Sequence, residues 1–113
     1  MMRRVPKPWG EEIIFAHTKR YAGKVLKIRQ GESLSLQYHV VKDEAIYVQE
    51  GKLRLILQVD GREEETLLGP GDSRHLPPGT RHRFEAISDC ILFEASTPEL
   101  DDVVRLADRY GRA

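Results

Sequence analysis

The sequence predicts an all-β fold of the sandwich or barrel type, on three observations. Over most of the chain, short segments with alternating or β-branched apolar residues follow one another. Glycine and proline separate these segments at short intervals, as at Gly31, Gly51 and Gly71. The pair Asp60 and Gly61 lies between two of the segments and is typical of a two-residue hairpin turn. Many short strands divided by turn residues are the pattern of a sandwich or barrel.

Eight strands are expected from this pattern. Their ranges are 24–29, 33–39, 45–49, 52–59, 63–68, 73–76, 81–86 and 90–95. Between the fourth and the fifth, Asp60 and Gly61 adopt a positive φ at little cost, so a type I′ hairpin is predicted there.

The two ends of the chain carry different signals. Trp9, a large aromatic residue near the N-terminus, is expected to pack against the barrel. Residues 98–110 predict a short closing helix packed on the barrel, with Thr97 as its cap and Pro98 in its first turn. Apolar residues recur in this segment at helical intervals, at Leu100, Val103, Val104 and Leu106.

Length and composition indicate one globular domain over residues 1–113. A chain of this length can form one hydrophobic core and is short for two. Hydrophobic residues make up 40% and charged residues 32%, which is ordinary for a folded protein and unlike a disordered one. Eighteen basic residues balance eighteen acidic ones, so no positive field draws the chain to a polyphosphate backbone. Nucleic acid is therefore not expected as a partner.

The cysteine content and the hydropathy pattern bear on location. Cys90 is the only cysteine, which excludes an intrachain disulfide and favours a reducing compartment such as the cytoplasm. The basic residues near the N-terminus precede no apolar stretch. Nowhere do about eighteen apolar residues run together, so neither an export segment nor a membrane span is expected.

Four polar residues form a candidate metal site. Gln37 and His39 share one face of an extended strand, because successive side chains alternate between faces. Glu44 opens the next strand and can point at the same place, and His82 would arrive from a later strand. Two imidazole nitrogens, a carboxylate and an amide oxygen suit a divalent first-row metal such as Zn, Mn, Fe, Co or Ni. The alternative is that these are solvated or hydrogen-bonded polar positions.

The chain resembles the cupin family at two motifs. Residues 31–51 read GESLSLQYHVVKDEAIYVQEG and residues 71–82 read GDSRHLPPGTRH, and both spacings are similar to those of cupins. The resemblance is closer to the cupin domain of mannose-6-phosphate isomerases, including the one at the C-terminus of bifunctional isomerase/guanylyltransferases. That branch has glutamine in place of the first motif histidine, as at Gln37, and similar flanks to KPWG at 7–10 and DDVVRLADRYGR at 101–112. The similarity extends over residues 6–112.

This resemblance implies a double-stranded β-helix, or jelly roll, and a specific chemistry. It makes Gln37, His39, Glu44 and His82 the metal ligands, with zinc as the first choice. It implies aldose–ketose isomerisation of a sugar phosphate, in which a base moves a proton between two carbons through an enediol. The chain departs from the isomerases after Glu44, where their tryptophan-containing stretch is replaced by AIY. It also lacks a nucleotidyltransferase's glycine-rich signature, so synthesis of a GDP-sugar is not implied.

Candidates for the base and for phosphate binding come from the strand pattern and from the resemblance. Lys24 shares a strand face with Leu26 and Ile28, and Glu94 shares one with Leu92, so either could point inward and act as the base. The plain alternatives are a lysine at the barrel mouth and a solvent-facing glutamate. The resemblance singles out Arg105 and Arg112 for a phosphate, and Arg83 beside His82 is a further candidate. All three arginines could equally be surface charges.

Two other functions and one assembly stay open at this point. A non-catalytic cupin that binds a metal and a sugar fits the short chain and the altered stretch after Glu44. An iron-dependent dioxygenase shares the scaffold, but cupin dioxygenases usually keep the second histidine of a His-x-His pair or a thiol near the metal, and here Gln37 is an amide. Apolar residues on both faces of the segment 52–59 predict a homodimer, in which one face meets another subunit.

Overall fold

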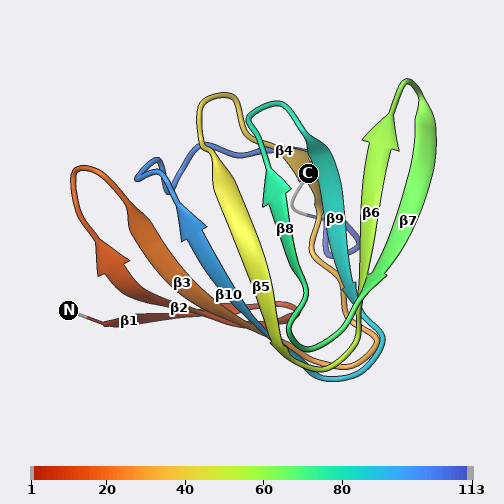
Figure 1. Ribbon diagram of the computed structural model, residues 1–113, viewed down its shortest axis with the longest axis horizontal. Coiled ribbons are helices and arrows are strands. Elements are labelled where there is room, and N and C mark those ends of the chain that lie inside the picture. Colours follow the sequence, from red (N-terminus) through yellow and green to blue (C-terminus); the bar gives the residue numbers. More distant parts are fainter. Residues whose placement is uncertain (1, 112–113) are drawn as a thin grey trace.

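Two antiparallel β-sheets that face each other make up the computed structural model, which describes residues 2–111 (Figure 1). The six-stranded sheet has the order β1 (Arg3–Lys7), β2 (Gly10–His17), β3 (Ala22–Ile28), β10 (Cys90–Ser96), β5 (Glu44–Glu50) and β8 (Ser73–Leu76). The five-stranded sheet has the order β11 (Val104–Ala107), β4 (Leu36–Tyr38), β9 (Arg81–Ala86), β6 (Leu53–Val59) and β7 (Arg62–Leu68). The predicted all-β jelly roll is confirmed.

Strands that are distant in sequence lie side by side in both sheets. Strand β10 pairs with β3 on one side and β5 on the other, and β9 lies between β4 and β6. Each of the eight expected ranges overlaps a strand. The predicted hairpin is confirmed as well, because Asp60 has a φ of 50° and Gly61 a φ of 76°, both positive as a type I′ turn requires.

The sequence pattern missed β1 and β2. Strand β1 is a short edge strand that contains Pro6, and proline is tolerated at an edge because no ladder hydrogen bond is needed from its nitrogen. Strand β2 does not alternate cleanly, since its pairing with β3 shifts between Ile14 and Ala16. Trp9, between the two strands, is 2% exposed and belongs to the core, as expected.

The predicted closing helix over 98–110 is wrong. No helix occurs among residues 2–111, so this part of the chain has none that could cross a membrane. Residues 98–103 form short turns, and 104–107 form β11, which pairs with the edge of β4. The β-branched pair Val103 and Val104 suits a strand, and the free edge of β4 offers it hydrogen-bond partners.

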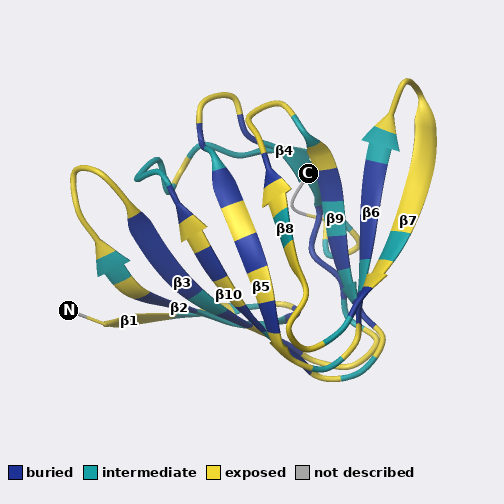
Figure 2. Ribbon diagram, in the orientation of Figure 1, coloured by how far each residue is buried: buried dark blue, intermediate teal, exposed yellow. Residues whose placement is uncertain are grey.

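Along β3 and β10, the inward-facing side chains change from apolar to polar or charged, and the candidate site lies where they are charged. In β10, Cys90 and Leu92 point into the core, whereas Glu94 and Ser96 occupy the same face nearer its other end. Strand β3 runs antiparallel and pairs Leu26 with Leu92 and Lys24 with Glu94. Buried positions appear as dark segments along these strands in Figure 2. The barrel therefore has an apolar end and an end lined by buried charges.

Candidate metal centre

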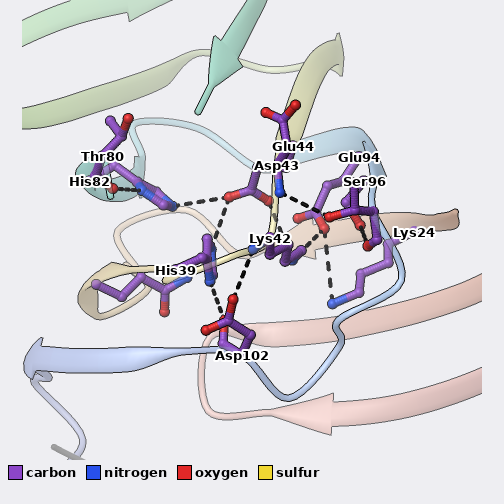
Figure 3. A network of polar contacts seen from close by, with 12 residues as sticks. Lys24, His39, Lys42, Asp43, Glu44, Thr80, His82, Glu94, Ser96 and Asp102 are labelled. Carbon is purple, nitrogen blue, oxygen red and sulfur yellow. Dashed lines mark hydrogen bonds and ion pairs between the residues drawn. The ribbon is translucent and has the colours of Figure 1, made fainter. Parts of the chain in front are cut away.

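His39, Glu44 and His82 come together at the charged end of the barrel (Figure 3). His39 follows β4, Glu44 opens β5 and His82 lies on β9, so the two sheets both contribute. Nε2 of His39 lies 3.0 Å from Oε1 of Glu44, and Nε2 of His82 lies 3.3 Å from the same oxygen. All three side chains are buried, and one donor atom from each lies within 4.8 Å of the others.

The far ring nitrogen of each histidine is tied to the backbone. Nδ1 of His39 lies 2.5 Å from the carbonyl oxygen of Asp102, and Nδ1 of His82 lies 2.9 Å from that of Thr80. A carbonyl oxygen only accepts hydrogen bonds, so Nδ1 carries the hydrogen in both rings. Nε2 of each ring then faces the carboxylate of Glu44, as a lone pair in the neutral ring and as an N–H donor when the ring carries a second proton. Nε2 of His82 has no hydrogen-bond partner among the described residues.

This arrangement of electron-rich atoms fits a cation. Three lone-pair donors that face one another in a buried site repel unless a positive charge lies between them. The residues present satisfy the usual preferences of a divalent ion, because neutral imidazole and carboxylate are its common ligands in this ratio. Histidines that bind metals also typically donate their other ring N–H to a carbonyl or carboxylate, as both do here.

Gln37 lies next to this group but is bonded elsewhere. It pairs directly with His82 across β4 and β9, so the two side chains extend to the same face. Oε1 of Gln37 accepts a hydrogen bond from Oγ of Ser35 at 2.7 Å. The sequence-predicted set of four is thus brought to one region, with the amide oxygen engaged by a hydroxyl.

A chain of buried ion pairs extends from Glu44 across the six-stranded sheet. Nζ of Lys42 lies 3.5 Å from Oε2 of Glu44 and 3.0 Å from Oε2 of Glu94. Nζ of Lys24 lies 4.0 Å from the same oxygen of Glu94 and 3.2 Å from Oε1 of Glu12. The side chains of Lys24, Lys42 and Glu94 are each less than one-tenth exposed. Both sequence-predicted candidates for the base, Lys24 and Glu94, belong to this chain.

Burial and mutual contact set the charges of these groups. Burial alone would raise the pKa of Glu44, but His39, His82 and the ammonium of Lys42 outweigh it and hold that pKa well below its usual range. Burial raises the pKa of Glu94 to about 7, and the charge of Glu44 adds to the rise. Burial would lower the pKa of Lys42, yet the carboxylates of Glu94 and Glu44 raise it. Glu44 therefore stays anionic and Lys42 cationic at neutral pH.

A cavity of about 230 Å³ borders the group, with Gln37, His39 and Glu44 in its wall. His82 is not part of this wall. Cationic side chains in the wall outnumber the carboxylates, so a bound divalent ion would make the cavity clearly positive. The cations are Arg3, Lys7, Lys24, Lys42 and Arg105, and the carboxylates are Glu12, Glu44, Glu94 and Asp101.

The three arginines predicted for phosphate binding lie in different places. Arg105 lines the cavity and pairs with Gln37 across β11 and β4, and its Nε is buried without a partner among the described residues. Arg83 lies outside the cavity wall, and its guanidinium donates to the carbonyl of Ala107 at 3.1 Å. Arg112 lies outside the described residues.

Sequence reasoning missed three residues of the site. Lys42 lies in the loop between β4 and β5, where no alternation separates an inward lysine from a solvated one. Glu12 lies on the unpredicted strand β2. Asp102 reaches the site from a segment about sixty residues further along, and no local pattern marks it. The nearest signal was the position of Lys42 between His39 and Glu44, inside the first motif.

A two-sheet jelly roll with a histidine, glutamate, histidine group at its charged end defines a class of small β-barrels with a candidate metal site. The chain belongs to the cupin family, because the sequence profile of the cupin domain matches residues 24–95.

Comparison with known proteins adds relatives and structural neighbours. The chain is 35% identical to mannose-1-phosphate guanylyltransferase ManC of Salmonella typhimurium strain LT2, over 99% of this chain and 24% of ManC. It thus spans about a quarter of the length of the curated relatives it matches. The structure of KdgF from Halomonas sp. has a TM-score of 0.73 and 25% identity over 89% of this chain and 88% of KdgF. Oxalate decarboxylase from Bacillus subtilis shares the fold, with a TM-score of 0.79 at 17% identity over 93% of this chain and 30% of that one.

Proposed function

We propose that the chain binds a divalent metal ion and interconverts the aldose and ketose forms of a sugar phosphate. The observation that carries the proposal is the convergence of two Nε2 atoms on Oε1 of Glu44, with both Nδ1 hydrogens committed to carbonyls. His39, Glu44 and His82 would hold the ion, and Gln37 would complete the set if its amide oxygen leaves Ser35. Nitrogen and oxygen donors favour zinc, and manganese, iron, cobalt and nickel also fit.

Relatives named for mannose phosphate chemistry support the substrate class. Because the chain matches only about a quarter of their length, their whole activity is not transferred to it. The excess of cationic side chains in the cavity wall independently supports an anionic substrate.

The bound ion would polarise the substrate's carbonyl and hydroxyl oxygens, and the proton transfer falls to the protein. We assign this transfer to Glu94, since it lines the cavity and is buried. Lys42 and Lys24 flank its carboxylate and fix its position. The burial of these groups excludes water, which protects an enediol from side reactions. Lys24 itself is the second candidate for the transfer, because it also lines the cavity.

Phosphate recognition is assigned to Arg105, which has an uncommitted Nε at the cavity wall. Arg3 of β1 lines the same cavity and is assigned to phosphate recognition together with Arg105. A guanidinium group suits this role because it can donate two parallel hydrogen bonds to two oxygens of one phosphate. Arg83 is engaged with Ala107 and would have to turn to contribute. Arg112 keeps the role that its resemblance implies and lies outside the described residues.

The proposal predicts metal-dependent turnover. Zinc-loaded protein should convert mannose-6-phosphate to fructose-6-phosphate, and a chelator should abolish the conversion. Glu94→Gln should lower kcat by about a hundredfold or more, since a placed general acid–base contributes that much, while zinc content stays unchanged. A coupled assay of fructose-6-phosphate formation, with zinc measured by elemental analysis, checks both.

Three results would separate this proposal from its alternatives. Metal-loaded protein that turns over no hexose or pentose phosphate contradicts the isomerase. Tight sugar-phosphate binding without conversion would then support the non-catalytic cupin. Oxygen consumption by iron-loaded protein would instead support the dioxygenase.

We further propose a homodimer through the outer face of the six-stranded sheet. The outer face of β6, which first indicated an interface, offers it little apolar area, because Ile56 there is only 8% exposed. Tyr47 and Phe93 of the other sheet stack with ring centroids 6.2 Å apart, and are 42% and 39% exposed. Val25 continues this row across β3. Because the chain has zero formal net charge, two copies do not repel each other through their net charge.

The dimer predicts a solution mass of twice 13.0 kDa at micromolar concentration, measured by sedimentation. Phe93→Glu should reduce the mass to that of one chain, because a charge would then be buried in an apolar contact. Glu63→Gln, on the exposed edge strand β7, is the control and should leave the mass unchanged. A wild-type protein that stays monomeric contradicts the proposal.

A further inference from the structure

Asp102 makes four contacts with the loop that carries the candidate ligands. Its carboxylate accepts hydrogen bonds from three consecutive backbone N–H groups, at 3.0 Å from Val40, 2.7 Å from Val41 and 2.8 Å from Lys42. Its own backbone carbonyl accepts the Nδ1 hydrogen of His39 at 2.5 Å. One residue therefore fixes both the ring of His39 and the backbone that follows it. Figure 3 shows Asp102 below His39 and Lys42.

These contacts constrain the short loop between two of the candidate ligands, His39 and Glu44. The loop joins His39 to Glu44, and its first two residues, Val40 and Val41, are each 62% exposed, so packing does little to hold this part of it. Three amide donors on one carboxylate are charge-assisted hydrogen bonds and replace the missing packing. The backbone N–H of Lys42, followed by those of Val41 and Val40, lowers the pKa of Asp102, so the carboxylate stays charged.

The two histidines differ in how their rings are oriented. His82 donates to the carbonyl of Thr80, two residues away on the same segment, so its tautomer is set locally. His39 depends on a carbonyl 63 residues further along the chain. Its orientation therefore requires the segment before β11 to dock against the loop after β4.

We propose that Asp102 is a positioning residue of the metal centre, which sets the tautomer of His39 and the spacing between His39 and Glu44. The inference rests on the metal binding proposed above. It assigns a function to the closing segment, which completes the site by docking rather than by supplying a ligand.

A second carboxylate provides a matched control. Asp72 also caps a turn, accepting a hydrogen bond from the backbone N–H of Gly69 at 2.8 Å, but it lies outside the cavity wall. Replacing Asp72 removes a turn hydrogen bond without touching the loop between His39 and Glu44. A purely structural role for Asp102 would make the two positions behave alike toward the metal.

The test compares Asp102→Ala, Asp102→Asn and Asp72→Ala by zinc titration and by ¹⁵N spectra of the histidine rings in metal-free protein. Asp102→Ala should bind zinc about 10- to 100-fold more weakly than wild type, which is the usual effect of losing a partner that orients a ligand. Asp102→Asn keeps one acceptor oxygen, so its loss of zinc affinity should be smaller. This variant also allows the comparison if Asp102→Ala does not fold. Asp72→Ala should leave zinc affinity unchanged.

The ring spectra give a second readout that a loss of overall stability would not produce. In both Asp102 variants the Nδ1–H form of His39 should decrease, whereas that of His82 should persist. Normal zinc affinity together with an unchanged His39 tautomer in both Asp102 variants overturns this inference and leaves the proposed function intact. Absence of zinc binding by the wild-type protein overturns the proposed function, and this inference with it.

Discussion

Replacing His82 with alanine is expected to abolish stoichiometric metal binding. The substitution removes one of two imidazole donors from a buried site and leaves Oε1 of Glu44 with the other, His39. The loss of affinity should exceed about a hundredfold, the upper range found when only an orienting partner of a ligand is lost. Because a ligand at 100 times its Kd stabilises the folded state by about 2.7 kcal/mol, zinc should raise the Tm of the wild type but not of the variant.

His75→Ala is the matched control for this prediction. His75 is exposed, bonds to Asp43 at 2.7 Å and lies outside the cavity wall. The control should keep both the metal content and the zinc-dependent rise in Tm. Elemental analysis after dialysis, combined with thermal unfolding with and without zinc, measures both quantities. Full metal occupancy in His82→Ala would contradict the site.

Replacing Lys42 with methionine is expected to destabilise the metal-free protein by about 3–5 kcal/mol, the range for removing one partner of a buried ion pair. Methionine fills a similar volume but leaves the carboxylates of Glu44 and Glu94 buried without the ammonium between them. Repulsion between the two acids adds to the desolvation of each. The free energy of unfolding from urea titration checks this.

Two companion variants make the result specific. Lys52→Met removes an exposed ammonium and should change the free energy of unfolding by no more than about 0.5 kcal/mol. Adding Glu94→Gln to Lys42→Met should recover part of the loss, because it removes one of the two uncompensated charges. Equal stability of Lys42→Met and wild type, both free of metal, would show that this lysine does not neutralise the buried acids.

The fold and the grouping of His39, Glu44 and His82 could be predicted because both depend on strand alternation and motif spacing. Alternation places Glu44 inward at the start of β5, and the two motifs bring β9 beside β4. The resemblance supplied what spacing alone left open, namely that a histidine 38 residues past Glu44 belongs to the same group.

The remaining features depend on contacts between distant segments, which leave no local pattern. The apolar residues in 98–110 are spaced as in a helix, but residues 104–107 form a strand because they pair with the edge of β4. A sequence does not reveal that this edge is available. Lys42 looks like any loop lysine until Glu94 is placed 3.0 Å from it. Asp102 acts through hydrogen bonds to a loop about sixty residues away. These three errors share a cause, because the deciding partner lies in another part of the chain.

X-ray absorption of the zinc-loaded protein tests the central claim most directly, since it reports the atoms around the ion itself. One zinc per chain is expected, in a shell of nitrogen and oxygen at about 2.0–2.2 Å and with outer-shell scattering from two imidazoles. Zinc bound without imidazole scattering, or no bound zinc at all, would contradict it.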